Sequence, residues 1–304
     1  MLVPQLDDLL ALRHQAQQIG LHTGQRVQTP LSGLYASVFR GQGMDFDEVR
    51  EYRYGDEIRN IDWRVTARMR KPYLKVYREE RERHVVLCVD IGSHMQFGTR
   101  GTFKSIQASY TTALLGWSAN GHGDKVGGLL FGQAKPLFFR PQRSQREFGR
   151  LLRQFTQTPQ ISAETVDLAQ ALEMLSRSTP TGALIFIIAD LHQIAADKLK
   201  KALTQIHQQH EVVLIHIVDQ ADYDLPAIGQ VNFNNLDNQK LTVNTDIKQG
   251  LQRYHLAWQH RQQNLEQLAH RLSLDLISIA TDDEVHDSLL TGLRQRMRQE
   301  LAHR

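Results

Sequence analysis

This chain of 304 residues has a single cysteine, Cys88, and no long apolar run. One cysteine excludes a disulfide within the chain and fits a reducing compartment. No apolar segment approaches the ~20 residues that span a bilayer. Asp7 and Asp8 near the start do not fit the basic and then apolar pattern of a signal peptide. We therefore expect a cytoplasmic protein without a membrane span.

The sequence also lacks a strong excess of either charge. It has 36 Lys and Arg against 33 Asp and Glu, so the net charge is +3. The most charged stretch, from Arg50 to Arg83, has 11 basic and 7 acidic residues. This balance is too even for a surface that follows a phosphate backbone. We expect no nucleic-acid partner.

Three apolar runs predict the core of the fold. Each run ends at an aspartate: 85–89 before Asp90, 183–189 before Asp190 and 212–218, apolar except for His216, before Asp219. Unbroken apolar runs are typical of parallel strands that are covered on both faces. Because helical patterns alternate with these strands, we expect an α/β fold, with a doubly wound, mostly parallel sheet flanked by helices. Ligands bind beyond the carboxyl ends of such strands, which makes Asp90 and Asp190 the first candidates for a site.

The sequence predicts two parts of unequal size. Residues 1–80 form an N-terminal extension with a helix (about 6–19), a Gly- and Ser-rich loop (33–43) and a charged block. Residues 81–304 form the main domain. Apolar alternation around an Asn/Asp turn predicts a β-hairpin insert near 229–243.

The charged block in the extension has three open interpretations. Asp56, Arg59 and Asp62 are three residues apart, so they can share a helical face and pair, and Asp56 is placed to cap a short helical turn. The block is a packing collar in which Trp63 is an apolar anchor, a partner-docking surface, or a nucleic-acid contact. Its candidate residues are Asp56, Arg59, Asp62, Trp63 and Arg68.

Three features together resemble the bacterial DUF58 family, whose main domain is similar to a von Willebrand factor A (vWA) domain. They are Gly55-Asp-Glu-Ile-Arg-Asn-Ile-Asp-Trp-Arg-Val-Thr-Ala-Arg68, the strand that ends at Asp90 with Met95 following, and Gly123-Asp-Lys-Val-Gly127 before an apolar strand. The resemblance implies a central, mostly parallel sheet flanked by helices. It also implies a MoxR-type AAA+ ATPase as partner, and no enzymatic activity is established for the family as a whole.

The resemblance further implies a metal-ion-dependent adhesion site at Asp90, Gly92, His94, Thr165 and Asp190. Two positions that carry serine in the family pattern are Gly92 and His94 here. Two oxygen ligands of a Mg²⁺ ion are therefore missing. Three alternatives stay open: a degenerate site without metal, a weak Mg²⁺ site, or a site in which His94 favours a transition metal. We expect no tightly bound cofactor.

No enzyme motif is convincing. Gly98–Ser105 imitates a phosphate-binding loop, but Phe103 replaces its second glycine, and a bulky side chain obstructs the wrapping of phosphate by the backbone. We expect a non-enzymatic adaptor that works with a MoxR-type ATPase on an unknown client protein in assembly or maturation. The alternative is a metal-dependent phosphoester hydrolase that uses Asp90 and Asp190.

Overall fold

The computed structural model divides the chain into two compact units, one of Met1–Thr23 with Arg83–Arg304 and one of Gly24–Glu82. It describes residues 3–16, 44–53, 56, 58, 61–79, 83–157, 165–226, 228–234 and 240–302. The predicted loop at 33–43 and the site candidate Arg59 lie outside these residues.

The first helices belong to the larger unit and not to a separate extension. The sequence placed residues 1–80 together, whereas α1 (Leu6–Ala11) and α2 (Arg13–Ala16) pack on the main core. Leu9 is 0% exposed within that core. The indole N–H of Trp117 donates a hydrogen bond of 3.0 Å to the carbonyl of Leu9. The larger unit covers the apolar side of α1, and the start of the chain therefore belongs to that unit.

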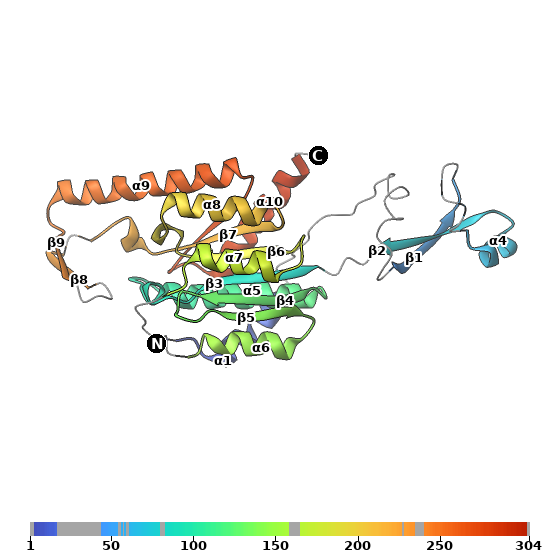
Figure 1. The fold of residues 1–304 in the computed structure, drawn as a ribbon, viewed down its shortest axis with the longest axis horizontal. Helices are drawn as coiled ribbons and strands as arrows, with labels where there is room; N and C mark the ends of the chain where they lie inside the picture. Colours follow the sequence, from blue (N-terminus) through green and yellow to red (C-terminus); the bar gives the residue numbers. More distant parts are fainter. Residues whose placement is uncertain are drawn as a thin grey trace. The chain divides into compact units, whose positions relative to one another are not determined.

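A six-stranded sheet forms the centre of the larger unit, in the order β10-β7-β6-β3-β4-β5 (Figure 1). All neighbouring strands are parallel except β5, which runs antiparallel to β4 at one edge. The predicted fold class is confirmed. The strands are β3 (His84–Asp90), β4 (Lys125–Phe131), β5 (Leu137–Gln142), β6 (Leu184–Ala189), β7 (Glu211–Val218) and β10 (Asp275–Ala280).

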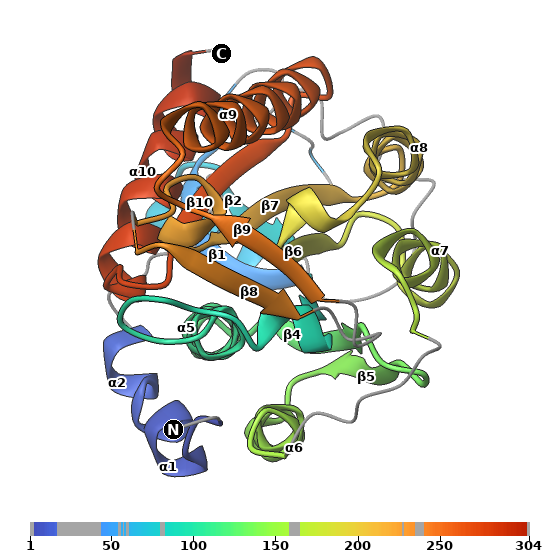
Figure 2. The ribbon, with the colours of Figure 1, turned by 90° about the vertical axis from the view of Figure 1, so that its left-hand side faces the viewer.

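Helices cover both faces of this sheet (Figure 2). One core cluster joins the sheet to α1, α2, α5, α6 and α10, and a second joins it to α7, α8 and α9. Every residue of β6 is buried, as expected for a strand between two helical layers. The helices are α5 (Lys104–Gly121), α6 (Gln145–Gln154), α7 (Leu168–Ser178), α8 (Ala196–His207), α9 (Lys248–Arg271) and α10 (Val285–Ala302).

The helix α7 begins with a capping box at Asp167. The Asp167 carboxylate accepts from the Gln170 N–H, and the Gln170 side chain accepts from the Asp167 N–H. This reciprocal pair satisfies two amide groups at once, which a single hydroxyl does not.

The predicted hairpin insert is present as β8 (Gln230–Asn234) and β9 (Lys240–Asn244), an antiparallel pair separate from the main sheet. Thr245 closes it, since its N–H and its hydroxyl both donate to the carbonyl of Gly229. Among the described helices, none is both long and apolar enough to cross a membrane.

The smaller unit contains a two-stranded antiparallel sheet, β1 (Met44–Glu51) with β2 (Tyr73–Glu79), and the short helix α4 (Trp63–Met69). The alternation of 73–77 predicts β2. Its partner β1 is absent from the prediction because four acidic residues interrupt the apolar pattern there.

Candidate functional site

The candidate aspartates lie at one edge of the main sheet, where the parallel strands end. Asp90 is the last residue of β3, Asp190 follows β6 and Asp219 follows β7. β3 pairs with β6, and β6 pairs with β7. The three carboxylates therefore follow adjacent strands, and we call this region the carboxyl edge.

Asp90 is 3% exposed, and both of its carboxylate oxygens have a partner. Oδ1 accepts the Gly92 N–H at 2.8 Å, and Oδ2 lies 2.9 Å from His94 Nε2. A Cβ atom at Gly92 would lie 2.7 Å from His94 Cε1, so a serine at 92 does not fit beside the imidazole in this position. The two departures from the adhesion-site pattern therefore depend on each other.

The pKa of His94 reflects this contact. Burial alone would lower the pKa of His94, but the hydrogen bond and the negative charge of Asp90 raise it above the usual 6.5. When it is protonated, the imidazole pairs with Asp90 in the way a bound cation would.

Lys104, at the start of α5, is 2% exposed and carries the second cation of this edge. Its Nζ lies 2.7 Å from Asp190 Oδ2 and 2.7 Å from Asp222 Oδ2. Opposing effects act on its pKa: burial lowers it, and the two carboxylates outweigh burial and raise it above 10.5. In the sequence, Lys104 is noticeable only as the lysine of a false phosphate-binding loop. The structure shows why that loop is false, since the ammonium faces two carboxylates.

Asp190 is held in its charged form. Burial would raise the pKa of Asp190, but the Lys104 ammonium holds it below 3.8. Besides Lys104, the carboxylate accepts the His192 N–H at 3.1 Å and the Gln193 side chain at 3.3 Å. For Asp222 burial prevails, and its pKa lies above 3.8 despite Lys104. Lys104 therefore forms a stronger ion pair with Asp190 than with Asp222.

Asp219 holds the loop that leads to Lys104. Its carboxylate accepts the Thr99 N–H at 2.8 Å and the Thr99 hydroxyl at 2.6 Å, together with the Thr281 hydroxyl at 2.5 Å. Burial opposes ionisation, but these hydrogen bonds lower the pKa of Asp219. The loop before α5 is thereby tied to the ends of β7 and β10.

Asp190, His192 and His216 are close enough for a metal, because one ligand atom of each lies within 4.8 Å of the others. The hydrogen bonding does not suit one. The Leu191 N–H donates to His216 Nδ1 at 3.1 Å, so the ring proton of neutral His216 is on Nε2. Burial lowers the pKa of His216 to about 3, which keeps it neutral. A metal-ligating imidazole donates through its other nitrogen, whereas this one accepts.

Thr165 is exposed, and among the described residues it makes no hydrogen bond with Asp90 or Asp190. A Mg²⁺ ion requires near-octahedral oxygen ligands. Here position 92 offers no side chain, position 94 offers an imidazole, and Asp190 faces an ammonium at 2.7 Å. The residues present do not fit the ion that the adhesion-site pattern implies.

The charged block contains residues that hold its backbone in place and residues that are exposed. Asp56 accepts two hydrogen bonds of 2.7 Å from Arg50 and one of 2.8 Å from the Arg53 N–H, and the Arg50 contact lowers its pKa. It therefore closes a turn with Arg53, whereas most of the turn that it is predicted to cap lies outside the described residues. The cap is Asp62, which accepts from the Arg64 and Val65 N–H groups at the start of α4.

Trp63 and Arg68 face solvent. Trp63 is 68% exposed among the described residues. The packing collar and the docking surface both stay predictions for this residue. Arg68 is also exposed.

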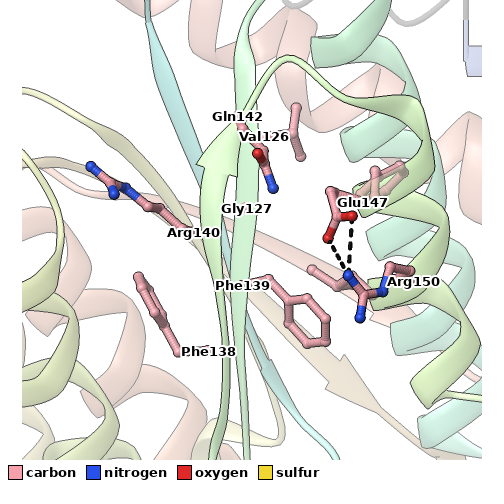
Figure 3. Close-up of a pocket in the computed structure, with 10 residues that line it drawn as sticks. Val126, Gly127, Phe138, Phe139, Arg140, Gln142, Glu147 and Arg150 are labelled. Atoms are coloured by element: carbon pink, nitrogen blue, oxygen red, sulfur yellow. Dashed lines mark hydrogen bonds and ion pairs between the residues drawn. The ribbon is translucent and has the colours of Figure 1, made fainter.

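A hollow of about 260 Å³ lies between the edge strand β5 and α6 (Figure 3). Phe139 lines it, and so do Glu147 and Arg150, whose side chains form an ion pair of 3.0 Å. Glu147 is its one lining carboxylate, and it is paired with Arg150.

Comparison with known proteins gives the following likenesses. Uncharacterized proteins of Mycobacterium tuberculosis and Mycobacterium bovis are 29% identical over 208 residues, which is 68% of this chain and 65% of theirs. The chain thus spans just under two thirds of the length of these curated relatives.

Two solved structures are also similar. An aerotolerance-related membrane protein from Bacteroides fragilis shares 13% identity at a TM-score of 0.45, over 71% of this chain and 99% of that one. The SpRpn10 VWA domain shares 11% identity at a TM-score of 0.38, over 68% and 93%. Residues 48–264, more than half of the chain, match the family described as "Protein of unknown function DUF58". The predicted family is confirmed, and the chain belongs to DUF58.

Proposed function

We propose that this chain is a non-enzymatic interaction module that works with a MoxR-type AAA+ ATPase in the assembly or maturation of a client protein. The observation that carries the proposal is the internal neutralisation of the carboxyl edge. Lys104 pairs with Asp190 and Asp222, and His94 pairs with Asp90. Membership of DUF58 and the vWA-like resemblance support the ATPase as partner.

This neutralisation speaks against the alternative of a phosphoester hydrolase. A nucleophilic or metal-binding carboxylate needs an oxygen that reaches the substrate. Asp90 and Asp190 are each 3% exposed, and both oxygens of each are hydrogen bonded. Neither side chain offers a free oxygen at the surface.

The same contacts support a degenerate adhesion site that works without a divalent ion. In a vWA-type site the metal neutralises the carboxylates and orients the surrounding loops. Here an ammonium and an imidazole from the chain itself lie against those carboxylates. Partner binding by this module is then independent of added metal.

The test is direct binding of this chain to the purified MoxR-type ATPase of the same organism, by biolayer interferometry. We expect saturable association, with the same affinity after this chain has been stripped of metal. A parallel assay with p-nitrophenyl phosphate and Mg²⁺ or Mn²⁺ should show no turnover. Absence of association would refute the adaptor. Metal-dependent turnover that is lost in Asp90→Asn would favour the hydrolase.

A further inference from the structure

The short helix α4 is fixed to its unit by one side. Asp62 caps its first turn, and the Thr66 hydroxyl accepts the Tyr73 N–H at 2.9 Å. Ile61 and Leu74 form an antiparallel bridge directly before the helix. Val65 and Thr66 are partly buried on this inner side. These contacts hold α4 in place without help from its outer residues.

The outer side of α4 has no cover in the described chain. Trp63, Arg64, Ala67 and Arg68 follow the i, i+1, i+4, i+5 spacing that places residues on one side of a helix. All four are exposed, and Trp63 is 68% exposed. A bare indole beside arginines costs solvation free energy and is typical of a contact surface.

Among the residues that the structure describes, the arginines of this surface have no carboxylate partner. Residues 63–71 contain four basic residues and no acidic one. Lys71 pairs with Glu51 at 3.0 Å. No described residue forms a hydrogen bond or ion pair with the side chains of Arg64, Arg68 or Arg70. Within the described residues, the guanidinium groups of Arg64 and Arg68 on this side are therefore available to a partner.

The chemistry favours a protein over nucleic acid or lipid. The unit Gly24–Glu82 has 12 basic and 10 acidic residues, a surplus of 2, which is too small to follow a phosphate backbone. α4 has seven residues, and its exposed large apolar side chains are Trp63 and Met69, too few for a helix that lies in a membrane surface. Trp with Arg is the composition of a protein interface hot spot.

We infer that Trp63, Arg64 and Arg68 of α4 form a docking surface for a protein that presents acidic side chains around an apolar socket. The inference rests on the proposed function for the identity of that protein, the MoxR-type ATPase. Trp63 fills the socket, and the guanidinium groups pair with the acidic rim. Asp56 and Asp62 serve this surface indirectly, because they hold the turn and the cap that present α4.

The test is binding of the full chain to the purified ATPase with three variants: Trp63→Ala, Arg64→Glu with Arg68→Glu, and the matched control Lys200→Glu with Lys201→Glu on the exposed side of α8. We expect the first two to weaken binding at least about tenfold and the control to bind like the wild type. Binding of the wild type should weaken with salt, and that of the Arg64/Arg68 variant much less. Trp63 should also be protected from acrylamide quenching in the complex.

Each outcome of this experiment either supports or overturns the docking surface. If the wild type binds and the α4 variants bind equally well, the docking surface is refuted while the proposed function stands. If the wild type does not bind the ATPase, the proposed function fails and the inference falls with it. Binding to anionic phosphatidylglycerol vesicles or to a single-stranded oligonucleotide, lost in the same α4 variants while ATPase binding persists, would assign the surface to lipid or nucleic acid and overturn the inference.

Discussion

The ammonium of Lys104 lies 2.7 Å from the carboxylate of Asp190, and neither side chain is more than 4% exposed. The two residues are 86 positions apart in the sequence. Their contact joins the start of α5 to the end of β6. It gives the carboxyl edge an internal cation at the place where the adhesion-site pattern implies a metal.

Replacing this cation should destabilise the fold. Lys104→Met leaves the Asp190 carboxylate buried without a counter-ion, so we expect the free energy of unfolding at pH 7 to fall by about 3–5 kcal/mol. Because the folded pKa of Asp190 is lowered, its contribution is present above pH 3.8 and is lost as the pH falls through the folded pKa. The difference between wild type and variant should therefore shrink on acidification.

Urea unfolding between pH 3 and pH 8 measures this difference. The milder variant Asp222→Asn keeps the Lys104–Asp190 pair and should lose less, and the exposed Lys200→Met serves as control. Equal stability of Lys104→Met and wild type at pH 7 would show that the ion pair contributes nothing.

The pair of His94 and Asp90 should give the opposite dependence on pH. The folded pKa of His94 is raised above 6.5, so its stabilisation is fully present below pH 6.5 and is lost as the pH rises through the folded pKa. We expect His94→Gln to lower the melting temperature more at pH 5.5 than at pH 8.5. A difference that does not change with pH would mean that His94 is neutral throughout.

Gly92 and His94 should be coupled. A Cβ atom at position 92 would lie 2.7 Å from the His94 ring. We expect Gly92→Ser to destabilise the protein by about 1–3 kcal/mol through this collision, and to cost much less in a His94→Ala background. A double-mutant cycle measures the coupling. Additive effects would show that the ring moves aside without strain.

The charged block should separate into a stabilising and an exposed group. Asp62→Ala removes the N-cap of α4, and we expect it to cost about 1 kcal/mol. Trp63→Ala removes a side chain that is 68% exposed and should leave the melting temperature unchanged within ~1 °C. Calorimetry of both variants tests this. A large fall in the melting temperature of Trp63→Ala would favour the packing-collar interpretation.

The sheet could be predicted from the sequence because its strands are continuous apolar runs, and burial on both faces leaves no other place for them. The aspartates at the strand ends followed from the same pattern. The strand β1 could not, because four acidic residues interrupt its apolar pattern. The hairpin β8–β9 was found because its turn residues and its alternation agree.

Only part of the chemistry of the carboxyl edge could be predicted from the sequence. Asp90 and Asp190 could be found, since each ends a strand, and the missing serines at 92 and 94 were evident. Lys104 could not be assigned, because its counter-ions lie 86 and 118 positions away. In sequence a buried lysine looks like an exposed one. The signal that was available is its position, as the only charged residue of the stretch 104–121 that forms α5.

A thermal-shift titration with Mg²⁺, Mn²⁺, Ca²⁺ and Zn²⁺ tests the central claim most directly, with Asp90→Ala and Asp190→Ala as controls. An ion that binds the folded state alone must raise the melting temperature once its concentration exceeds its Kd. If Lys104 and His94 neutralise the edge, no ion shifts the wild type. A saturable rise in the wild type that both aspartate variants abolish would contradict the account.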